Sequence, residues 1–196
     1  GGGSLAKWLG QYWPEVELDI VEVDPAVVRM ADEYFGYQAP RNHHVFVKDA
    51  RAFLHATTEK YDVIWADAFA RHLIPFHLTT VEFFSELRSR LSPNGVVAVN
   101  IASSGEGGDL LRATAVVETL KKVFPVIETY AVKGPWRTKQ KGAENIIFLG
   151  GTPVEQGTYD EFISGVQALV QARRLPPEAV SLLASRRPEP CPGSWP

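Results

Sequence analysis

The chain begins with a glycine-rich turn, Gly1-Gly2-Gly3-Ser4, and its next strand-like stretch ends in the carboxylate of Glu22. Glycines allow the backbone to approach a ligand closely, and a carboxylate at the end of a strand can accept hydrogen bonds from ribose hydroxyls. This pair predicts a doubly wound α/β domain that binds an adenosine-containing cofactor. Such a turn normally follows a central strand, so we expect that the first strand of the sheet is absent from the sequence.

A stretch of glycine and serine is also typical of a flexible linker. Here it leads directly into apolar residues that recur at helical spacing, with Pro14 after them, which favours an amphipathic helix. Those residues are Leu5, Trp8, Leu9 and Tyr12. We therefore interpret the glycines as part of the fold.

Length and composition indicate an ordinary globular protein. With 196 residues the chain can form one full core, which we expect over residues 1–186, followed by an extended or disordered proline-rich tail, 187–196. The net charge of −3 gives no electrostatic footprint for nucleic acid, and no apolar run is long enough for a membrane segment. The single cysteine, Cys191, excludes an internal disulfide and indicates a reducing, cytoplasmic location.

Strand and helix patterns alternate along the chain. The predicted strands are residues 17–23, 44–48, 61–66, 96–101, 126–132 and 145–149. Helices are predicted after Asp24-Pro25, after Asp49, after the capping-box-like Thr79-Thr80-Val81-Glu82, and at 109–124, 159–173 and 177–185, with a turn at Ser92–Gly95. The last two strands, joined by a basic loop at 133–144, predict an antiparallel hairpin.

This order resembles the S-adenosylmethionine-dependent methyltransferase fold, a doubly wound Rossmann-like α/β fold. Its sheet is mostly parallel, and its last strand runs against the others.

Three carboxylates, Glu22, Asp49 and Asp67, follow or end three successive predicted strands. In a parallel sheet these ends share one edge, where ligands bind. Glu22 can accept the ribose hydroxyls, Asp49 the adenine amino group, and Asp67 would face the reacting end of the cofactor. Each acid could instead be a turn or helix-cap residue. Asp24 is better explained as a helix N-cap, with Pro25 behind it.

Five blocks of sequence resemble the spermidine synthase-like family, a branch of the methyltransferase fold. They are the glycine turn, VEVDP at 21–25, KDARAFL at 48–54, YDVIWADAF at 61–69 and FFSELRSRLSPNGVVAVN at 83–100. The resemblance implies that residues matching Glu22 and Asp49 hold the adenosine and that the residue matching Asp67 anchors or deprotonates the attacking amine. The predicted cofactor-binding residues are Gly1, Gly2, Gly3, Ser4, Glu22, Asp49, Ala50 and Asp67.

Two positions depart from the aminopropyltransferases of this family. Those enzymes carry an aspartate directly after the glycines, where this chain has Ser4, and a second acid after the fourth strand, where it has Ala70. Decarboxylated S-adenosylmethionine ends in an ammonium group that needs a carboxylate near it. Intact S-adenosylmethionine ends in an amino acid, whose carboxylate suits a helix N-terminus and a serine hydroxyl. The family predicts aminopropyl transfer in polyamine biosynthesis, whereas the local chemistry favours intact S-adenosylmethionine and methyl transfer, or an altered acceptor. The two reactions are nearly equal alternatives.

Either reaction needs a nucleophile that is held in place and kept unprotonated. Asp67 is the predicted proton acceptor or amine anchor. The loop Ala68–Leu78 is the predicted acceptor lid, in which His72 or His77 could act as base, although such histidines often only bond the backbone. No metal site is expected, because the adjacent His43 and His44 would point to opposite faces of a strand.

Several readings remain open at this point. The chain is expected to be a transferase that acts on a small-molecule acceptor, and a homodimer is a candidate assembly. A nicotinamide-dependent oxidoreductase fits the glycine turn and Glu22, but it does not fit Asp49 or the terminal hairpin. A non-catalytic nucleotide-binding module fits a chain that lacks its first strand.

Overall fold

The structure is a computed structural model that describes residues 1–68, 74–103, 107–132, 144–151, 167–168 and 171–172. Contacts divide the described chain into two compact units. The first contains Gly1–Thr57, and the second contains the described residues from Thr58 to Gly151. Each unit is described by itself below.

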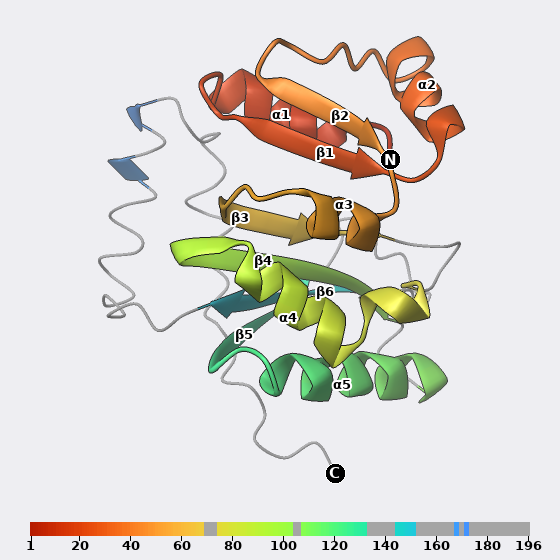
Figure 1. The fold of residues 1–196 in the computed structure, drawn as a ribbon, viewed down its shortest axis with the longest axis vertical. Helices are drawn as coiled ribbons and strands as arrows, with labels where there is room; N and C mark the ends of the chain where they lie inside the picture. The colour runs from red at the N-terminus through yellow and green to blue at the C-terminus, as the bar shows by residue number, and fades with distance from the viewer. Residues whose placement is uncertain (69–73, 104–106, 133–143, 152–166, 169–170, 173–196) are drawn as a thin grey trace. The chain divides into compact units, whose positions relative to one another are not determined.

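The first unit is built on two parallel strands, β1 (Leu18–Glu22) and β2 (His43–Val47), which run side by side (Figure 1). Three helices accompany them: α1 (Ser4–Tyr12), α2 (Pro25–Glu33) and α3 (Ala50–Ala56). Because the strands are parallel and Glu22 pairs with Val47, the residues that follow both strands emerge at one edge of the sheet.

Small and aromatic side chains form the core of the first unit. Ala6 of α1, Ala31 of α2 and Tyr37 form a buried cluster, against which apolar residues of both strands pack. Those strand residues are Leu18, Ile20 and Val45. Phe53 of α3 is also buried and packs on Phe46 of β2, with 4.9 Å between ring centroids. The alternating strand and helix pattern of the sequence thus places each helix against the pair of strands.

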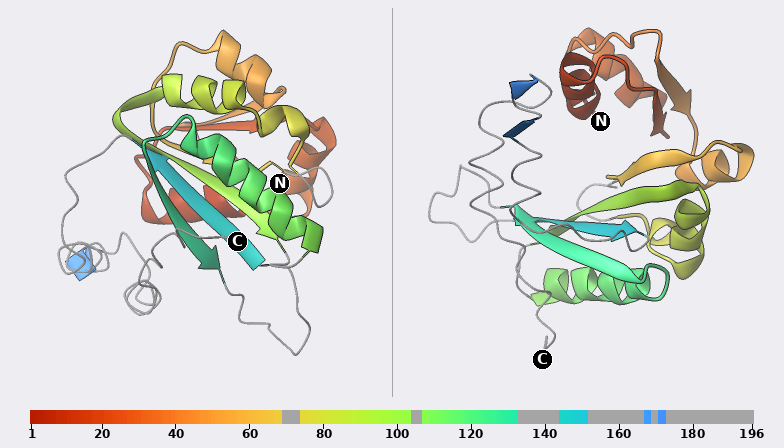
Figure 2. Two further views of the ribbon diagram at one scale, coloured as in Figure 1. Left: turned by 90° about the horizontal axis from the view of Figure 1, so that it is seen from below. Right: turned by 90° about the vertical axis from the view of Figure 1, so that its left-hand side faces the viewer.

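The second unit contains a four-stranded sheet in the order β3-β4-β6-β5. Its strands are β3 (Tyr61–Ala66), β4 (Leu91–Ser103), β5 (Val126–Val132) and β6 (Glu144–Gly151). Strands β3 and β4 are parallel, whereas β6 runs antiparallel to both of its neighbours. Figure 2 shows β5 and β6 lying side by side as the predicted hairpin.

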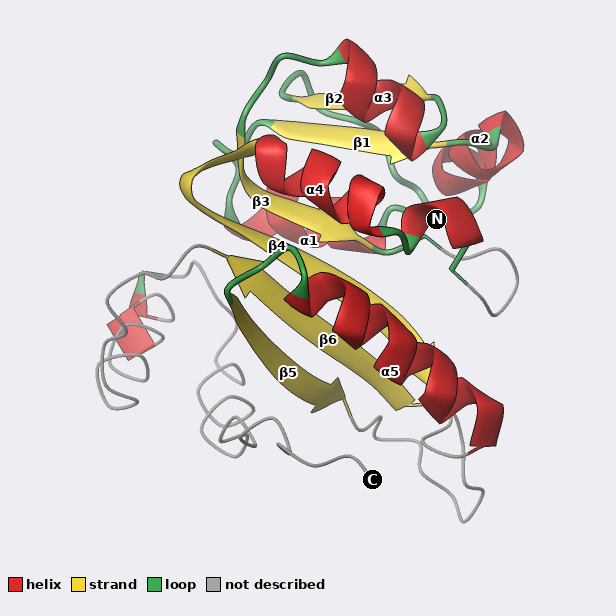
Figure 3. Ribbon diagram, turned by 60° about the horizontal axis from the view of Figure 1, so that its bottom comes forward, coloured by secondary structure: helices red, strands yellow, loops and turns green. Residues whose placement is uncertain are grey.

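Two helices, α4 (Val81–Ser89) and α5 (Gly107–Lys121), pack against this sheet (Figure 3). A short 3-10 turn, η1 (Phe76–Leu78), precedes α4. The most deeply buried side chains come from α4, β4 and α5, and they are Phe84, Val97 and Leu120. The nearly continuous apolar run of β4 is therefore explained by burial in a covered strand.

The predicted strands and the order of the helices up to residue 151 are confirmed, with shifts of a few residues at some ends. The predicted turn at Ser92–Gly95 is wrong, since these residues belong to β4. They absorb a register shift: Tyr61 pairs with Leu91, but Val63 pairs with Val96. Gly95 is required there, because a Cβ would lie 2.8 Å from the carbonyl oxygen of Tyr61.

The N-cap of α4 lies one residue later than the predicted capping box. Thr80 accepts a hydrogen bond from the backbone N–H of Phe83 at 3.2 Å, whereas the hydroxyl of Thr79 donates to the carbonyl of Phe76 at 2.8 Å. Because the side chain of Thr79 bonds the preceding 3-10 turn, Thr80 is the residue that caps the helix.

Other expectations fall outside the described residues. They are the tail 187–196, most of the basic loop 133–144, and nearly all of the helices at 159–173 and 177–185. The single domain over residues 1–186 stays a prediction. Among the residues that are described, the helices are too short or too polar to cross a membrane.

Candidate functional site

The glycine turn has a backbone that only glycine adopts easily. Gly3, the residue before α1, has φ of 72° and ψ of 12°, which lies in the left-handed region. A Cβ at Gly3 would lie 2.6 Å from Cγ of Tyr37, and one at Gly2 would lie 3.2 Å from Cγ of Phe35. Both conformation and close packing therefore require glycine at Gly3, so the turn is part of the fold and not a linker.

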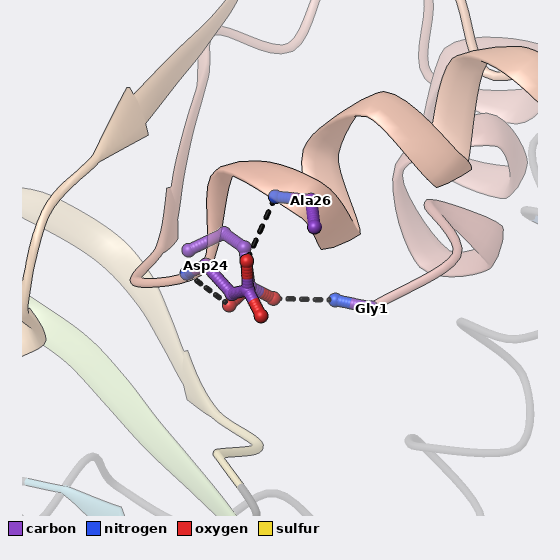
Figure 4. A network of polar contacts seen from close by, with 4 residues as sticks. Gly1, Asp24 and Ala26 are labelled. Carbon is purple, nitrogen blue, oxygen red and sulfur yellow. Dashed lines mark hydrogen bonds and ion pairs between the residues drawn. The ribbon is translucent and has the colours of Figure 1, made fainter.

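Glu22, at the end of β1, lies against this turn. The nitrogen of Gly1 donates to Glu22 Oε2 at 3.0 Å, and the backbone N–H of Asp24 donates to Oε1 at 3.1 Å (Figure 4). The Glu22 side chain retains 21% exposure. The structure therefore brings the turn and this carboxylate together within the first unit, and their role toward a cofactor stays a prediction.

The two aspartates that follow β1 and β2 both cap helices. Asp24 Oδ1 accepts from the backbone N–H of Ala26 at 2.7 Å, with Pro25 as the first residue of α2. Asp49 Oδ1 accepts from the N–H groups of Arg51 and Ala52 at 2.9 and 3.1 Å. The cap assigned to Asp24 is confirmed. Asp49 is a cap as well, and its role toward adenine, with that of Ala50 beside it, stays a prediction.

The first turn of α1 offers donors without a competing acid. Ser4 is the exposed first residue of α1, the first turn contains no acidic residue, and Gly3 has no side chain with which to cap the helix. The first N–H groups of a helix attract anions. The local chemistry therefore suits a ligand carboxylate at this position better than an ammonium group.

In the second unit, Asp67 directly follows β3. Ala66 pairs with Val99, so Asp67 stands opposite Asn100 of β4. Asn100 Nδ2 donates to Asp67 Oδ1 at 2.9 Å, and Asn100 Oδ1 is buried with no hydrogen-bond partner in the described part of the protein. Asn100 was missed in the sequence. A signal for it existed, since Asn100 is a polar residue in the otherwise apolar run VVAVNI.

The two loop histidines give different outcomes. His77 lies in the 3-10 turn η1 and is exposed. His72 falls within residues 69–73, outside the described residues, as does Ala70. The predicted role of His72 or His77 as a base thus stays a prediction, and so does the acceptor lid at Ala68–Leu78.

The adjacent histidines at the start of β2 face opposite ways, as predicted. His43 is buried, whereas His44 is exposed and lies 3.5 Å from Glu17. Within the described ranges, no group of three or more His, Cys, Asp or Glu side chains is arranged to hold a metal ion.

Comparison with known proteins decides the family. The model of the spermine/spermidine synthase domain matches residues 3–142. The chain belongs to this family. The resemblance of the five sequence blocks to the spermidine synthase-like family is therefore confirmed.

The relatives and structural neighbours fall into two classes. A polyamine aminopropyltransferase from Vibrio vulnificus is 40% identical over 117 residues, which cover 58% of this chain and 39% of that protein. An N-terminal histidine N-methyltransferase from Emericella nidulans is 36% identical over 122 residues, covering 59% of this chain and 21% of the relative. The chain therefore spans less than half the length of the curated relatives it matches.

A solved structure supports the fold assignment. Human methyltransferase-like protein 13, in complex with SAH, superposes with a TM-score of 0.72 at 25% identity, covering 90% of this chain and 79% of that one. The predicted Rossmann-like methyltransferase fold, with its terminal antiparallel hairpin, is confirmed.

Proposed function

We propose that this chain is the nucleotide-binding domain of a spermidine synthase-like transferase. It binds S-adenosylmethionine or decarboxylated S-adenosylmethionine and transfers an alkyl group, in the first instance an aminopropyl group, to a small amine. The bound cofactor supplies an electrophilic carbon next to a sulfonium, and the protein supplies binding, orientation and proton acceptance.

One observation carries this proposal. The carboxylate of Glu22 lies within hydrogen-bond distance of the glycine turn, with 3.0 Å between Gly1 N and Glu22 Oε2. A carboxylate that lies beside the nitrogen of Gly1, and that is still part exposed, fits a ribose whose hydroxyls need an acceptor beside a close backbone approach. Gly1, Gly2, Gly3 and Ser4 would line the rest of the ligand, and Asp49 with Ala50 would lie toward the adenine.

Asp67 is the proposed anchor or proton acceptor for the amine. Amines are mostly protonated at neutral pH, so a nucleophilic amine needs a group that takes its proton. The amide of Asn100 holds one carboxylate oxygen of Asp67 at 2.9 Å, which fixes the orientation of the acid. His72 and His77 remain proposed alternatives for the base.

Methyl transfer is the second candidate, and Ser4 favours it. The first turn of α1 lacks the acid that would pair with the ammonium end of the decarboxylated cofactor. The methyltransferase relative and the methyltransferase structural neighbour agree with this alternative. The proposed acceptor is a small molecule in both cases, and the proposed location is the cytoplasm.

Calorimetric titration of the purified chain tests the proposal. The ligands are S-adenosylmethionine, decarboxylated S-adenosylmethionine, methylthioadenosine and NAD. Tighter binding of the decarboxylated form supports aminopropyl transfer, and tighter binding of the intact form supports methyl transfer. Binding of NAD alone would overturn the family-based proposal in favour of an oxidoreductase, and the absence of any binding would indicate an inert domain.

A matched pair of variants sharpens the comparison. Ser4→Asp restores the acid that aminopropyltransferases of the family carry, whereas Ser4→Asn has similar size without the charge. We expect Ser4→Asp to shift the affinity ratio toward decarboxylated S-adenosylmethionine by about tenfold, the value of one charge-assisted contact. An equal shift in Ser4→Asn would contradict the charge argument.

A further inference from the structure

A pocket of about 270 Å³ lies in the first unit between α1 and the segment that leads into β2. Its lining includes Lys7 and Gly10 from α1, and Tyr37 and His43 from the other side. The roles proposed above for the glycine turn and the strand ends do not use the side chains of Lys7 and His43.

The imidazole of His43 is the main polar group of this pocket. His43 is only 5% exposed, and its Nδ1 lies 2.9 Å from the hydroxyl of Tyr37, which is also buried. A buried phenol must place its hydrogen on an acceptor. We assign the hydroxyl as the donor and Nδ1 as the acceptor, which puts the ring hydrogen of the neutral imidazole on Nε2.

The Nε2 atom of His43 is buried without a hydrogen-bond partner in the described part of the chain. A buried N–H that lacks an acceptor costs free energy, so native structures rarely keep one without a reason. Since Nε2 belongs to a residue that lines the pocket, an acceptor atom placed in the pocket would satisfy it.

Gly10 keeps the space over this imidazole open. A Cβ at Gly10 would lie 3.5 Å from Cε1 and 4.0 Å from Nε2 of His43. Glycine within a helix is less favourable than alanine, and Gly10 lies in the last turn of α1, which extends from Ser4 to Tyr12. The helix thus carries an unfavourable residue at a position where a methyl group would contact the ring of His43.

The charge of the pocket indicates the class of ligand. Lys7 donates to the carbonyl oxygen of Phe35 at 2.6 Å, and an ammonium group has further hydrogens to donate. Among the described residues that line the pocket, Lys7 is a cation and none has a carboxylate side chain. A small organic anion therefore fits, with one carboxylate oxygen on His43 Nε2 and its charge near Lys7.

We propose that this pocket binds the carboxylate of a small organic anion, through His43 Nε2–H and the ammonium of Lys7, in space that Gly10 leaves open. The site is separate in its residues from the proposed nucleotide site. A ligand in the pocket would contact α1, the helix that begins at the glycine turn.

Nuclear magnetic resonance of the intact chain, with ¹⁵N-labelled histidine, tests the proposal. The probe is sodium acetate, with sodium chloride as the ionic-strength control and inorganic phosphate as a second anion. We expect a saturable shift of the His43 Nε2 resonance with acetate in the millimolar range, no shift with chloride, and an unchanged resonance for the exposed His44. A response to phosphate but not to acetate would overturn the carboxylate assignment.

The variant Gly10→Ala provides the steric test. Alanine is a better helix former than glycine and its Cβ makes ordinary contact with His43, so the variant should fold. We expect acetate to bind at least about tenfold more weakly to it, while the affinity for S-adenosylmethionine stays within about twofold. Lys7→Gln should weaken acetate binding without moving the Nε2 resonance of the free protein. A pocket that holds only water predicts no saturable shift in any form of the protein, and this result would sink the proposal.

Discussion

Asn100 and Asp67 form a side-chain pair across neighbouring parallel strands, with Asn100 Nδ2 donating to Asp67 Oδ1 at 2.9 Å. The amide thus holds the carboxylate of an exposed acid in one orientation, while the amide oxygen is buried. Because Asp67 is the proposed amine anchor, this contact connects the packing of β4 to the proposed chemistry. Asn100 is a positioning residue in this scheme.

The Asn100→Ala variant should lose activity with little loss of stability. Removing one hydrogen bond to a charged group misaligns Asp67, and we expect kcat to fall by about tenfold with a smaller change in KM. The matched control is Asn94→Ala, an exposed asparagine on the same strand. Steady-state kinetics, with the cofactor that binds more tightly in the titration, measure kcat and KM for both variants. Equal losses in the two variants would show that the contact with Asp67 is unimportant.

Glu22 and Asp24 lie two residues apart and should have separable roles. Glu22→Gln keeps the size of the side chain but removes the charge, and we expect about tenfold weaker cofactor binding. Asp24→Ala removes the bond to Ala26 N, and it should lower the free energy of unfolding by about 1 kcal/mol while leaving affinity nearly unchanged. Calorimetry and urea unfolding measure the two quantities. The reverse pattern would exchange the two assignments.

Gly3→Ala should destabilise the first unit more than Gly36→Ala does. Both glycines have positive φ, 72° at Gly3 and 62° at Gly36, so both variants carry a backbone cost of about 1–2 kcal/mol. Only at Gly3 would the new Cβ meet a ring, at 2.6 Å from Tyr37 Cγ, whereas Gly36 has open space. The clash should add about 1–3 kcal/mol in urea unfolding. Equal losses would mean that Tyr37 can move aside.

Acid should destabilise the protein through His43. Burial lowers the pKa of His43 below its ordinary value of 6.5, with Glu17 opposing this effect and His44 adding to it. The unfolded chain takes up this proton near pH 6.5, and the folded chain does so only at lower pH. The unfolded state then binds more protons, so the free energy of unfolding falls as the pH decreases below about 6.5.

Urea unfolding above and below pH 6.5 checks this dependence. The His43→Phe variant, which cannot be protonated there, should lose less stability on acidification than the unmodified chain. The control His44→Gln replaces the exposed neighbour, and it should retain the loss seen in the unmodified chain. A His43→Phe variant with the full acid-side loss would assign the effect to other groups.

The sequence was sufficient for the local elements and for one half of the proposed site. The period of the apolar residues located β1 and β3, and Asp24-Pro25 located the start of α2, because these signals arise from neighbours in the chain. Glu22 could be placed at the glycine turn because strand ends in a parallel sheet share an edge. The turn at Ser92–Gly95 failed because pairing with β3 drew those residues into a strand.

What the sequence determined by itself is the order of strands and helices, the antiparallel hairpin and the family, since each depends on patterns read along the chain. Tertiary structure alone decided that Asn100 orients Asp67, that Tyr37 closes on Gly3, and that His43 is buried beneath Gly10 with an unsatisfied nitrogen. The reason is physical. These contacts join residues that are far apart in the sequence, so no local pattern predicts them. They depend on strand register and on the packing of α1.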